Sequence, residues 1–416
     1  MDLPKQIIYA LKKIMDDGGK AYLVGGAVRD LILKRDIPDY DISSSLSPSR
    51  IEALFSDHRS YKLGKSFGTI GVIIDSIPIE ITTMRSEGAY SDKRHPDKVY
   101  FIDDIVSDLA RRDFTINAMA YNPLTSTDLV DPFRGRADLE AGIIRSVANA
   151  RHRFEEDPLR ILRALRFASQ LSFRLEANTY KAILESYQLL SLISKERIND
   201  EFTKLLLSPR PDLGLRLAQE TKLIDIILPF KTNRGLSRAS LEIIRLSKAE
   251  LPLRLAALIY YLFMDDATDM VEKLASLRYP KALISQVKRL VGGYLILKDM
   301  DESPYAMRRL LVFTGRQTAK QLLSWYMHEA YVNKNKNTRA RYEKLYGLMI
   351  RVVEDNDPID LKDLAISGKD VLAAGIGSDR PELVGLALDL AHELVLKNPK
   401  MNDKDLLIKS LISKFK

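Results

Sequence analysis

The sequence contains no cysteine, and histidine is scarce. Without cysteine the chain has no disulfide partner, no thiolate nucleophile and no Cys-ligated zinc or iron–sulfur site. The five histidines, at positions 58, 95, 152, 328 and 392, are scattered along the chain. No close pair of them has the spacing of metal ligands, so a histidine metal site is not predicted.

Long apolar segments are also absent. The most apolar stretch, residues 251–264, is interrupted by Arg254 and is too short to span a bilayer. The N-terminal residues MDLPKQIIYALKK show neither a long apolar run nor a small-residue cleavage site, which argues against a signal peptide. We therefore predict a cytoplasmic protein with no membrane partner.

The length and net charge of the chain are compatible with several classes of protein. The chain has 416 residues, of which 46% are hydrophobic and 29% charged. This is enough to bury large cores in roughly two to four domains. Lys and Arg total 64 against 56 Asp and Glu, which gives a net charge of +8. Such an excess suits a polyanionic partner, but many ordinary enzymes are equally basic.

The first third of the chain has the pattern of a mixed α/β domain. Short apolar or alternating segments predict strands at 21–24, 39–42, 68–75, 77–83 and 99–102, with a hairpin turn at Ser76 and a helix at 27–33. The last strand lies within residues 84–108, a polar stretch predicted as a long loop.

From about residue 139 the pattern becomes almost wholly helical. Apolar residues recur three and four apart, as in 158–171, 178–190 and 197–207. The predicted fold class is α+β, a small head with a mixed sheet followed by a long helical part. We predict a catalytic head at 1–138, a helical neck at 139–208, a helical body at 209–300 and a helical tail at 301–416.

The tetrapeptide Asp39-Tyr40-Asp41-Ile42 places two acidic residues on a predicted strand. Residues two apart on a strand point to the same face, so the carboxylates would lie side by side. Like charges disfavour joint ionisation, and Mg²⁺, which prefers oxygen ligands, would relieve this. Two metals about 3.5–4 Å apart could stabilise the attacking and leaving oxygens of a phosphoryl transfer. A solvent-facing turn is the alternative for an isolated Asp-x-Asp.

Further candidates accompany this pair in the predicted head. Gly25 and Gly26 end a strand and precede a helix, where backbone N–H groups could hold a triphosphate. Arg29, in the first turn of that helix, could contact the same anion. Glu80, on the hairpin strand, could supply a third carboxylate. An ordinary turn and a surface glutamate are the alternatives.

Together these residues resemble a known family. The segment LVGGAVRD at 23–30, followed by Asp39 and Asp41, looks like the opening motif of class II tRNA nucleotidyltransferases and bacterial poly(A) polymerases, in the polymerase-β-like nucleotidyltransferase superfamily. Four later segments match the remaining motifs in the family's order: RRDFTINA at 111–118, DPFRG at 131–135 with Asp138-Leu139, EDPLRILRALRF at 156–167 and ERINDEF at 196–202. The resemblance covers roughly residues 21 to 207, and five ordered motifs make it highly specific.

The resemblance implies a polymerase-β-like head, an Mg²⁺ cofactor and roles for individual residues. In the second motif, Arg112 would touch phosphate or ribose, and Asp113 the ribose hydroxyls or a helix N-terminus. Asn117 could face the nucleotide, with an exposed amide on the helix surface as the alternative. In the last motif, Arg197 and Glu201 would buttress the nucleotide-selecting helix.

Asp157 and Arg160 are three apart on a predicted helix and would face the same way. A carboxylate can accept from the exocyclic amine of cytosine or adenine, and a guanidinium can donate to the ring nitrogen on the same edge. Uracil and guanine would leave these groups unpaired. Arg163 and Arg166 follow at three-residue steps and could contact the triphosphate or the RNA end. An ordinary ion pair and a solvated basic face are the alternatives.

A loop carries a second resemblance. Arg85-x-Glu87-Gly88-x-Tyr90-x-Asp92-x-Arg94-x-Pro96 resembles the full-length flexible loop of family members that add the terminal A. Members restricted to CC addition have a shortened loop, so this segment argues against CC-only activity.

The C-terminal part offers a basic surface. Residues 308–351 contain ten Lys and Arg against two acids, with tyrosines interleaved. Such a surface could grip the tRNA backbone, and the candidates are Lys334, Lys336, Arg339 and Arg341. A solvated helical pair with core tyrosines is the alternative.

We therefore predict an enzyme that adds CCA to the 3′ end of tRNA from CTP and ATP, releases pyrophosphate and depends on Mg²⁺. The alternatives within the enzyme class are an A-adding tRNA nucleotidyltransferase and a poly(A) polymerase. From another class, the alternative is a non-catalytic tRNA-binding module. The intact carboxylate pair argues against that module, because binding alone does not need it.

Overall fold

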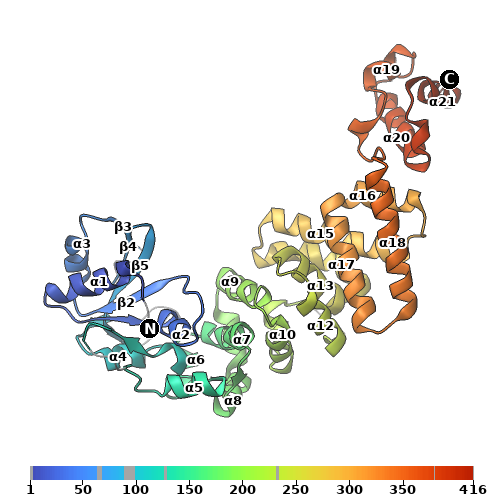
Figure 1. Ribbon diagram of the computed structural model, residues 1–416. Helices are drawn as coiled ribbons and strands as arrows, with labels where there is room; N and C mark the ends of the chain where they lie inside the picture. The colour runs from blue at the N-terminus through green and yellow to red at the C-terminus, as the bar shows by residue number, and fades with distance from the viewer. Residues whose placement is uncertain are drawn as a thin grey trace. The chain divides into compact units, whose positions relative to one another are not determined.

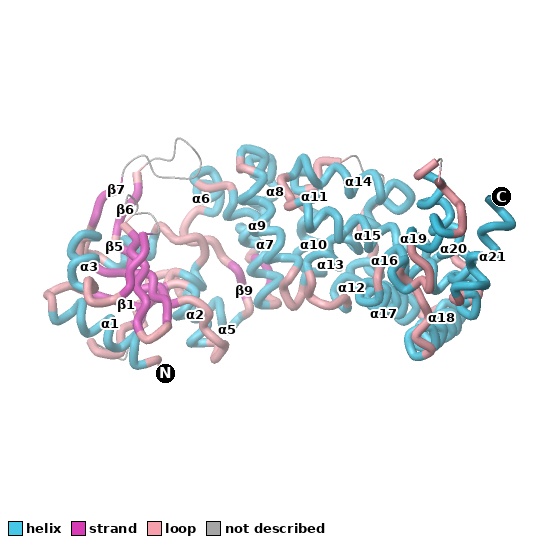
Figure 2. The backbone as a smooth tube through the Cα atoms, turned by 90° about the horizontal axis from the view of Figure 1, so that it is seen from above, coloured by secondary structure: helices cyan, strands magenta, loops and turns pink. Residues whose placement is uncertain are grey.

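The structure is a computed structural model that describes residues 3–62, 68–88, 99–125, 129–230, 234–378 and 380–415. The chain forms two compact units, Met1–Phe230 and Lys231–Lys416. All of the described strands belong to the first unit, and the second is built from helices (Figures 1 and 2). The predicted α+β class is confirmed, whereas the finer division into head, neck, body and tail stays a prediction.

The first unit holds a six-stranded mixed sheet in the order β3-β4-β5-β2-β1-β8, and two small two-stranded sheets, β6–β7 and β9–β10. The strands are β1 (Ala21–Val24), β2 (Tyr40–Ser44), β3 (Arg59–Lys62), β4 (Thr69–Ile74), β5 (Ile77–Thr83), β6 (Arg85–Glu87), β7 (Val99–Phe101), β8 (Ala120–Tyr121), β9 (Ile143–Ile144) and β10 (Arg174–Leu175).

The predicted hairpin is present, with β4 and β5 joined through Asp75 and Ser76. Both turn residues have positive φ, 45° and 69°, as expected for the tight two-residue turns that match strand twist. β5 then runs parallel to β2, and the register sets Glu80 opposite Asp41. Because side chains alternate along a strand, these two carboxylates share one face of the sheet.

The helices of the first unit are α1 (Lys5–Asp16), α2 (Gly26–Ile32), α3 (Pro48–Leu54), α4 (Ile105–Ala110), α5 (Gly135–Ala141), α6 (Ala150–Glu156), α7 (Leu159–Leu171), α8 (Ala177–Ser186), α9 (Lys195–Leu206), α10 (Pro211–Glu220) and α11 (Ile224–Ile227), with 3₁₀ turns at Thr115–Asn117 and Tyr187–Leu192. α1 and α3 contact each other and the sheet. α4 contributes Ile105 and Leu109 to a separate buried cluster with Val24 and Met84. α7 packs between α9 and α10.

The second unit consists of α12 (Arg238–Leu246), α13 (Leu251–Phe263), α14 (Ala267–Lys273), α15 (Lys281–Asp299), α16 (Pro304–Thr314), α17 (Arg316–Val332), α18 (Lys336–Glu354), α19 (Gly368–Ala373), α20 (Glu382–Lys397) and α21 (Lys404–Phe415). Trp325 on α17 is fully buried and stacks on Tyr294 of α15 at 3.8 Å between ring centroids. The last three helices enclose a smaller core of their own around Val371, Ala387 and Leu407.

Two sequence predictions differ from the structure. The stretch 84–108, predicted as a loop with one strand, also contains β6 and most of α4, whose N-cap is the Asp104 side chain. The helix predicted to carry Asp157 is interrupted there, because α6 ends at Glu156 and α7 begins at Leu159. None of the described helices has both the length and the apolar content needed to cross a membrane.

Candidate active site

A cavity of about 710 Å³ opens within the first unit, and its lining is strongly charged. Eight of the lining residues are Lys or Arg and five are Asp. A basic excess of this kind favours an anionic ligand of high charge. The predicted site residues that line the cavity are Gly25, Gly26, Arg29, Asp39, Asp41, Arg112, Asp113, Asn117, Asp157, Arg160, Arg163, Arg166 and Arg197.

The acidic corner of the cavity is formed by Asp39, which is exposed just before β2, and Asp41, which is half-buried on it. Burial and the neighbouring Asp39 raise the pKa of Asp41, while Arg112 opposes this rise. Burial, Asp41 and Asp39 likewise raise the pKa of Glu80. Glu80 is therefore an electrostatic neighbour of the pair, although it is not among the residues that line the cavity.

The described residues contain no group of three His, Asp or Glu side chains arranged to hold a metal ion. The role of Glu80 as a third carboxylate therefore stays a prediction. Asp39 and Asp41 alone still fit Mg²⁺, which is commonly held by one or two carboxylates together with substrate phosphates. Their mutual repulsion is also the electrostatic situation that a divalent cation would relieve.

Gly25 brings the acidic corner and an arginine together. Its φ of 70° and ψ of −135° lie in a region that is essentially restricted to glycine. A Cβ on this residue would lie 2.8 Å from Arg112 Nη1 and 3.5 Å from Asp41 Oδ2. The missing side chain therefore leaves room for the Arg112 guanidinium beside the carboxylate. Arg112 Nε is buried and has no hydrogen-bond partner within the described part of the chain.

Arg29 is fixed by two neighbours. Its Nε and Nη2 donate to the two carboxylate oxygens of Asp30 at 2.9 and 2.7 Å, and its Nη1 donates to Asn117 Oδ1 at 2.8 Å. The Asn117 amide donates in turn to Asp113 Oδ1 at 3.1 Å. Asn117 is thus a buried connector on a 3₁₀ turn, where the sequence left open an exposed helical amide.

Asp113 links this chain of contacts to α7. Its Oδ2 lies 2.8 Å from Arg163 Nε, and Arg163 also lies 3.4 Å from Glu201 Oε1 on α9. Burial by itself would raise the pKa of Asp113, but the Arg163 guanidinium and the Asn117 amide lower it to about 2. Asp113 is consequently a buried anion that contacts Arg163 directly and Arg29 through Asn117. Both of its carboxylate oxygens are already engaged.

Phe167 on α7 lies under three guanidinium groups. The Cζ atoms of Arg166, Arg29 and Arg163 lie 4.3, 5.3 and 5.3 Å from its ring centroid. Glu201 lies 2.9 Å from Arg166 Nε, and burial beside Arg163 lowers the pKa of Arg166 to about 10. Three clustered cations repel one another, and the Phe167 ring and the Glu201 carboxylate offset this repulsion. The common position of the three guanidinium groups favours binding of an anion at this wall of the cavity.

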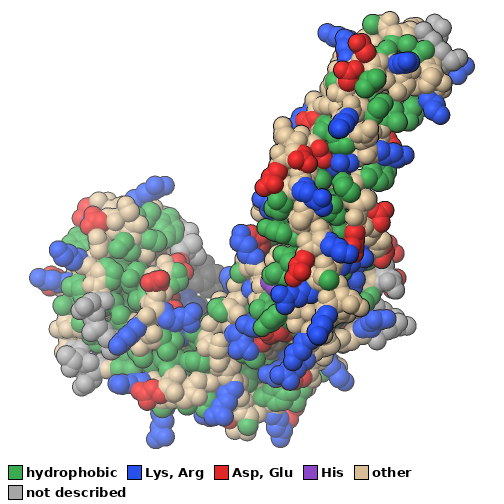
Figure 3. Space-filling model, turned by 45° about the vertical axis from the view of Figure 1, so that its right-hand side comes forward, with side chains coloured by type: hydrophobic (Ala, Val, Ile, Leu, Met, Phe, Trp, Pro, Cys, Tyr) green, Lys and Arg blue, Asp and Glu red, His purple; other side chains and the backbone are tan. Residues whose placement is uncertain are grey.

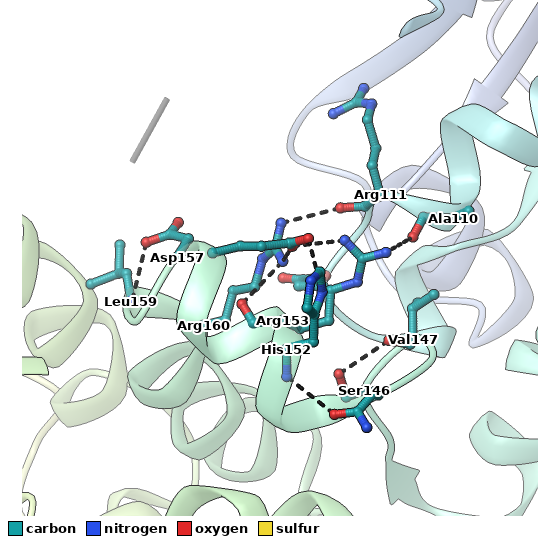
Figure 4. Close-up of polar contacts among 12 residues, drawn as sticks. Ala110, Arg111, Ser146, Val147, His152, Arg153, Asp157, Leu159 and Arg160 are labelled. Atoms are coloured by element: carbon teal, nitrogen blue, oxygen red, sulfur yellow. Dashed lines mark hydrogen bonds and ion pairs between the residues drawn. The ribbon is translucent and has the colours of Figure 1, made fainter. Parts of the chain in front are cut away.

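The pair at the start of α7 does not have the predicted geometry (Figure 4). Asp157 has extended backbone, and its carboxylate accepts from the Leu159 backbone N–H and from Arg197 Nη2, both at 3.1 Å. Arg160 is buried, and its guanidinium donates to Glu156 Oε2 at 2.6 Å and to the Arg111 carbonyl at 3.2 Å. Both side chains line the cavity, but Asp157 lies in the break between α6 and α7, whereas Arg160 lies in the first turn of α7.

The predicted loop lies largely outside the described residues, namely at 89–98, and the side chain of Glu87 is likewise not described. Arg85 begins β6, and its backbone N–H donates to Asp108 Oδ1 at 3.2 Å.

The four predicted RNA-binding residues of the second unit fall into two kinds. Lys334, Lys336 and Arg339 are exposed where α17 meets α18. Arg341 instead is partly buried and donates to the backbone carbonyls of Leu297 and Met300, at 3.1 and 2.5 Å. On the face drawn in Figure 3, Lys and Arg side chains of this unit are interspersed with acidic and apolar ones.

Sequence reasoning missed several contributors to the cavity. Asp30, Arg111, Phe167 and Lys204 line it without having been assigned a role. Asp30, Arg111 and Phe167 belong to motif segments, and this was a usable signal. Lys204 lies outside these segments, and its place in the cavity depended on how α7 and α9 pack together.

Two parts of the chain match described protein families. Residues 21–145 match the family described as "Poly A polymerase head domain", and residues 172–233 match "Probable RNA and SrmB- binding site of polymerase A". The first match contains the acidic corner and Arg112, and the second contains Arg197 and Glu201.

Curated relatives extend the similarity over nearly the whole chain. A CCA-adding enzyme of Pediococcus pentosaceus is 34% identical over 97% of this chain and 96% of the relative. One from Staphylococcus epidermidis is 34% identical over 87% of this chain and 86% of the relative. A crystal structure of the CCA-adding enzyme of Bacillus stearothermophilus in complex with CTP has 29% identity and a TM-score of 0.79, and it covers 100% of this chain and 98% of its own.

Proposed function

Because the chain belongs to the family of CCA-adding enzymes, we propose that it completes the 3′ end of tRNA by adding C, C and A from CTP and ATP. The observation that carries this proposal is the single cavity that joins an aspartate pair at the start of β2 to an arginine-rich wall and to Asp157 and Arg160. This combination suits transfer of a nucleotide with an amine-bearing base.

The reaction joins the 3′-hydroxyl of the RNA to the α-phosphate of the nucleotide and releases pyrophosphate. Arg29, Arg163 and Arg166 neutralise the triphosphate, and Gly25 lets the backbone and Arg112 approach it closely. Asp39 and Asp41 would hold Mg²⁺, which would supply charge neutralisation and would lower the pKa of the attacking hydroxyl. Positioning and electrostatics supply most of the catalysis in phosphoryl transfer, so no separate general base is needed.

Base selection falls to Asp157 and Arg160. In the present arrangement Asp157 is engaged by Arg197, and Arg160 by Glu156. A base that offers an amine to Asp157 and a ring acceptor to Arg160 can satisfy both without leaving a buried polar atom unpaired. Uracil and guanine cannot do so, which costs them binding energy in this site.

The decisive assay uses purified protein, Mg²⁺ and tRNA that ends at the discriminator base, with CTP and ATP given separately and together. We expect CCA from the mixture and CC from CTP alone, as read by sequencing the products. Addition of A only to tRNA already ending in CC would mean an A-adding enzyme. Long A tails would mean a poly(A) polymerase, and no incorporation would favour a binding module.

For RNA binding we propose Lys334, Lys336 and Arg339 as phosphate contacts. Replacing all three by alanine should weaken tRNA binding and lower the slope of log K against log salt by about 0.7–0.9 per lost contact. The measurement is a salt titration of tRNA affinity.

Arg341→Ala is the matched control, since this arginine contacts carbonyls at the end of α15. We expect it to lower the melting temperature and leave the salt slope unchanged. A triple variant with parental affinity would remove this surface from the proposal.

A further inference from the structure

Asp108 on α4 is the most deeply buried carboxylate near the cavity, with an exposed fraction of 0%. It is absent from the cavity lining and from the roles assigned above. A buried carboxylate without partners would be strongly unfavourable, so its contacts indicate what it does.

The partners of Asp108 come from three separate segments. Oδ1 accepts from Arg111 Nε at 3.0 Å and from the Arg85 backbone N–H at 3.2 Å. Oδ2 accepts from the Ser43 hydroxyl at 3.0 Å and lies 3.6 Å from Arg112 Nη2. Ser43 is two residues beyond Asp41 on β2 and therefore on the same face of the strand.

These contacts place one negative charge behind two arginines that line the cavity. Burial alone would raise the pKa of Asp108, but Arg111 and Arg112 lower it below its usual value, so the group is an anion at neutral pH. Among the described residues, the Arg112 side chain makes only long polar contacts, 3.4 Å to the Ser43 hydroxyl and 3.6 Å to Asp108. Its position beside Gly25 and Asp41 thus depends on the electrostatic attraction of Asp108.

We propose that Asp108 is a positioning residue for nucleotide binding: it holds the Arg112 guanidinium beside the Asp39–Asp41 pair and ties it to β2 and to the start of β6. This inference rests on the proposed function, because it takes Arg112 as a contact to the nucleotide. Asp108 itself does not touch the substrate, but it determines the position of Arg112, which does.

The test is Asp108→Asn, which keeps the side-chain shape and removes the charge. We expect KM for both CTP and ATP to rise about tenfold, as for loss of a charged hydrogen bond, with kcat nearly unchanged. In an Arg112→Ala background the same substitution should raise KM little further, because its effect acts through Arg112. Ser43→Ala removes one hydrogen bond to the same carboxylate and should also raise KM, by a smaller factor. It provides the test if Asp108→Asn does not fold.

Asp104→Ala is the matched control for a purely structural role. Asp104 is the exposed N-cap of the same helix, accepts from the backbone N–H of Val106 and Ser107, and is not among the cavity residues. It should lower the melting temperature and leave KM unchanged. Parental KM in folded Asp108→Asn, or equal effects with and without Arg112, would overturn the positioning role. Failure of the parent protein to bind CTP or ATP at all would instead overturn the proposed function.

Discussion

Replacing Asp41 by asparagine is expected to lower kcat by roughly a thousandfold or more, since it removes a ligand of the proposed catalytic cation. The substitution preserves shape and keeps one oxygen acceptor, so the cavity walls stay in place. The measurement is single-turnover incorporation of CMP into tRNA at saturating CTP, which separates chemistry from binding.

The same substitution should not destabilise the fold. Burial and Asp39 raise the pKa of Asp41, so its charged form costs stability at neutral pH when no cation is bound. Removing that charge relieves the repulsion. We therefore expect the variant without metal to melt no lower than the parent, and Mg²⁺ to raise the melting temperature of the parent but not of the variant.

Asp36→Asn is the matched control, an exposed aspartate between α2 and β2 that does not line the cavity. It should retain both activity and the response to Mg²⁺. Near-normal turnover by Asp41→Asn would remove the metal assignment from this pair, whereas a collapsed melting temperature would mean that Asp41 has a structural role.

The parts of the site that could be predicted from the sequence are those with local signals. The aspartate pair needs only strand alternation, and the hairpin that carries Glu80 was indicated by turn residues between two β-rich segments. The turn at Gly25 could also be predicted, because a glycine between a strand and a helix is typical of a turn with positive φ. These features depend on a few neighbouring residues.

The break at Asp157 was available in the sequence but was outweighed by the helical pattern. Pro158 follows directly, and a residue before proline is disfavoured in the helical region. The pairing of Arg160 with Glu156, four residues earlier, also had a local signature. The helix predicted at 158–171 was instead extended back to Asp157, so that Asp157 and Arg160 were placed on one helix.

Other contacts could not be predicted because they join distant segments. Asp108 meets Ser43 and Arg85 only after α4 has packed against the sheet, so its neighbours in sequence reveal at most the pairing with Arg111. In the same way, a basic pattern on α18 gave no sign that Arg341 turns toward the end of α15 while Arg339 stays exposed. A charge pattern identifies basic residues, but it does not reveal which of their side chains are already hydrogen-bonded to backbone carbonyls.

Replacing Arg160 by alanine is expected to reduce the preference for CTP and ATP over UTP and GTP by about ten- to a hundredfold, the range for losing one charged hydrogen bond to the base. The quantity to measure is the ratio of kcat/KM for CTP to that for UTP. Use of CTP should slow because cytosine loses a hydrogen bond, and use of UTP should be less penalised because no Arg160 donor is left unpaired against uracil.

Alanine at this position also leaves Glu156 without one of its partners, so a matched control is needed. Arg153 contacts the same Glu156 oxygen at 2.7 Å and the Ala110 carbonyl at 2.6 Å, yet does not line the cavity. Arg153→Ala should therefore lower stability and leave the CTP-to-UTP ratio intact. If both variants changed the ratio equally, the effect would come from a displaced α7. If Arg160→Ala left the ratio unchanged, selection would have to come from elsewhere in the cavity, and the side-chain template would be wrong.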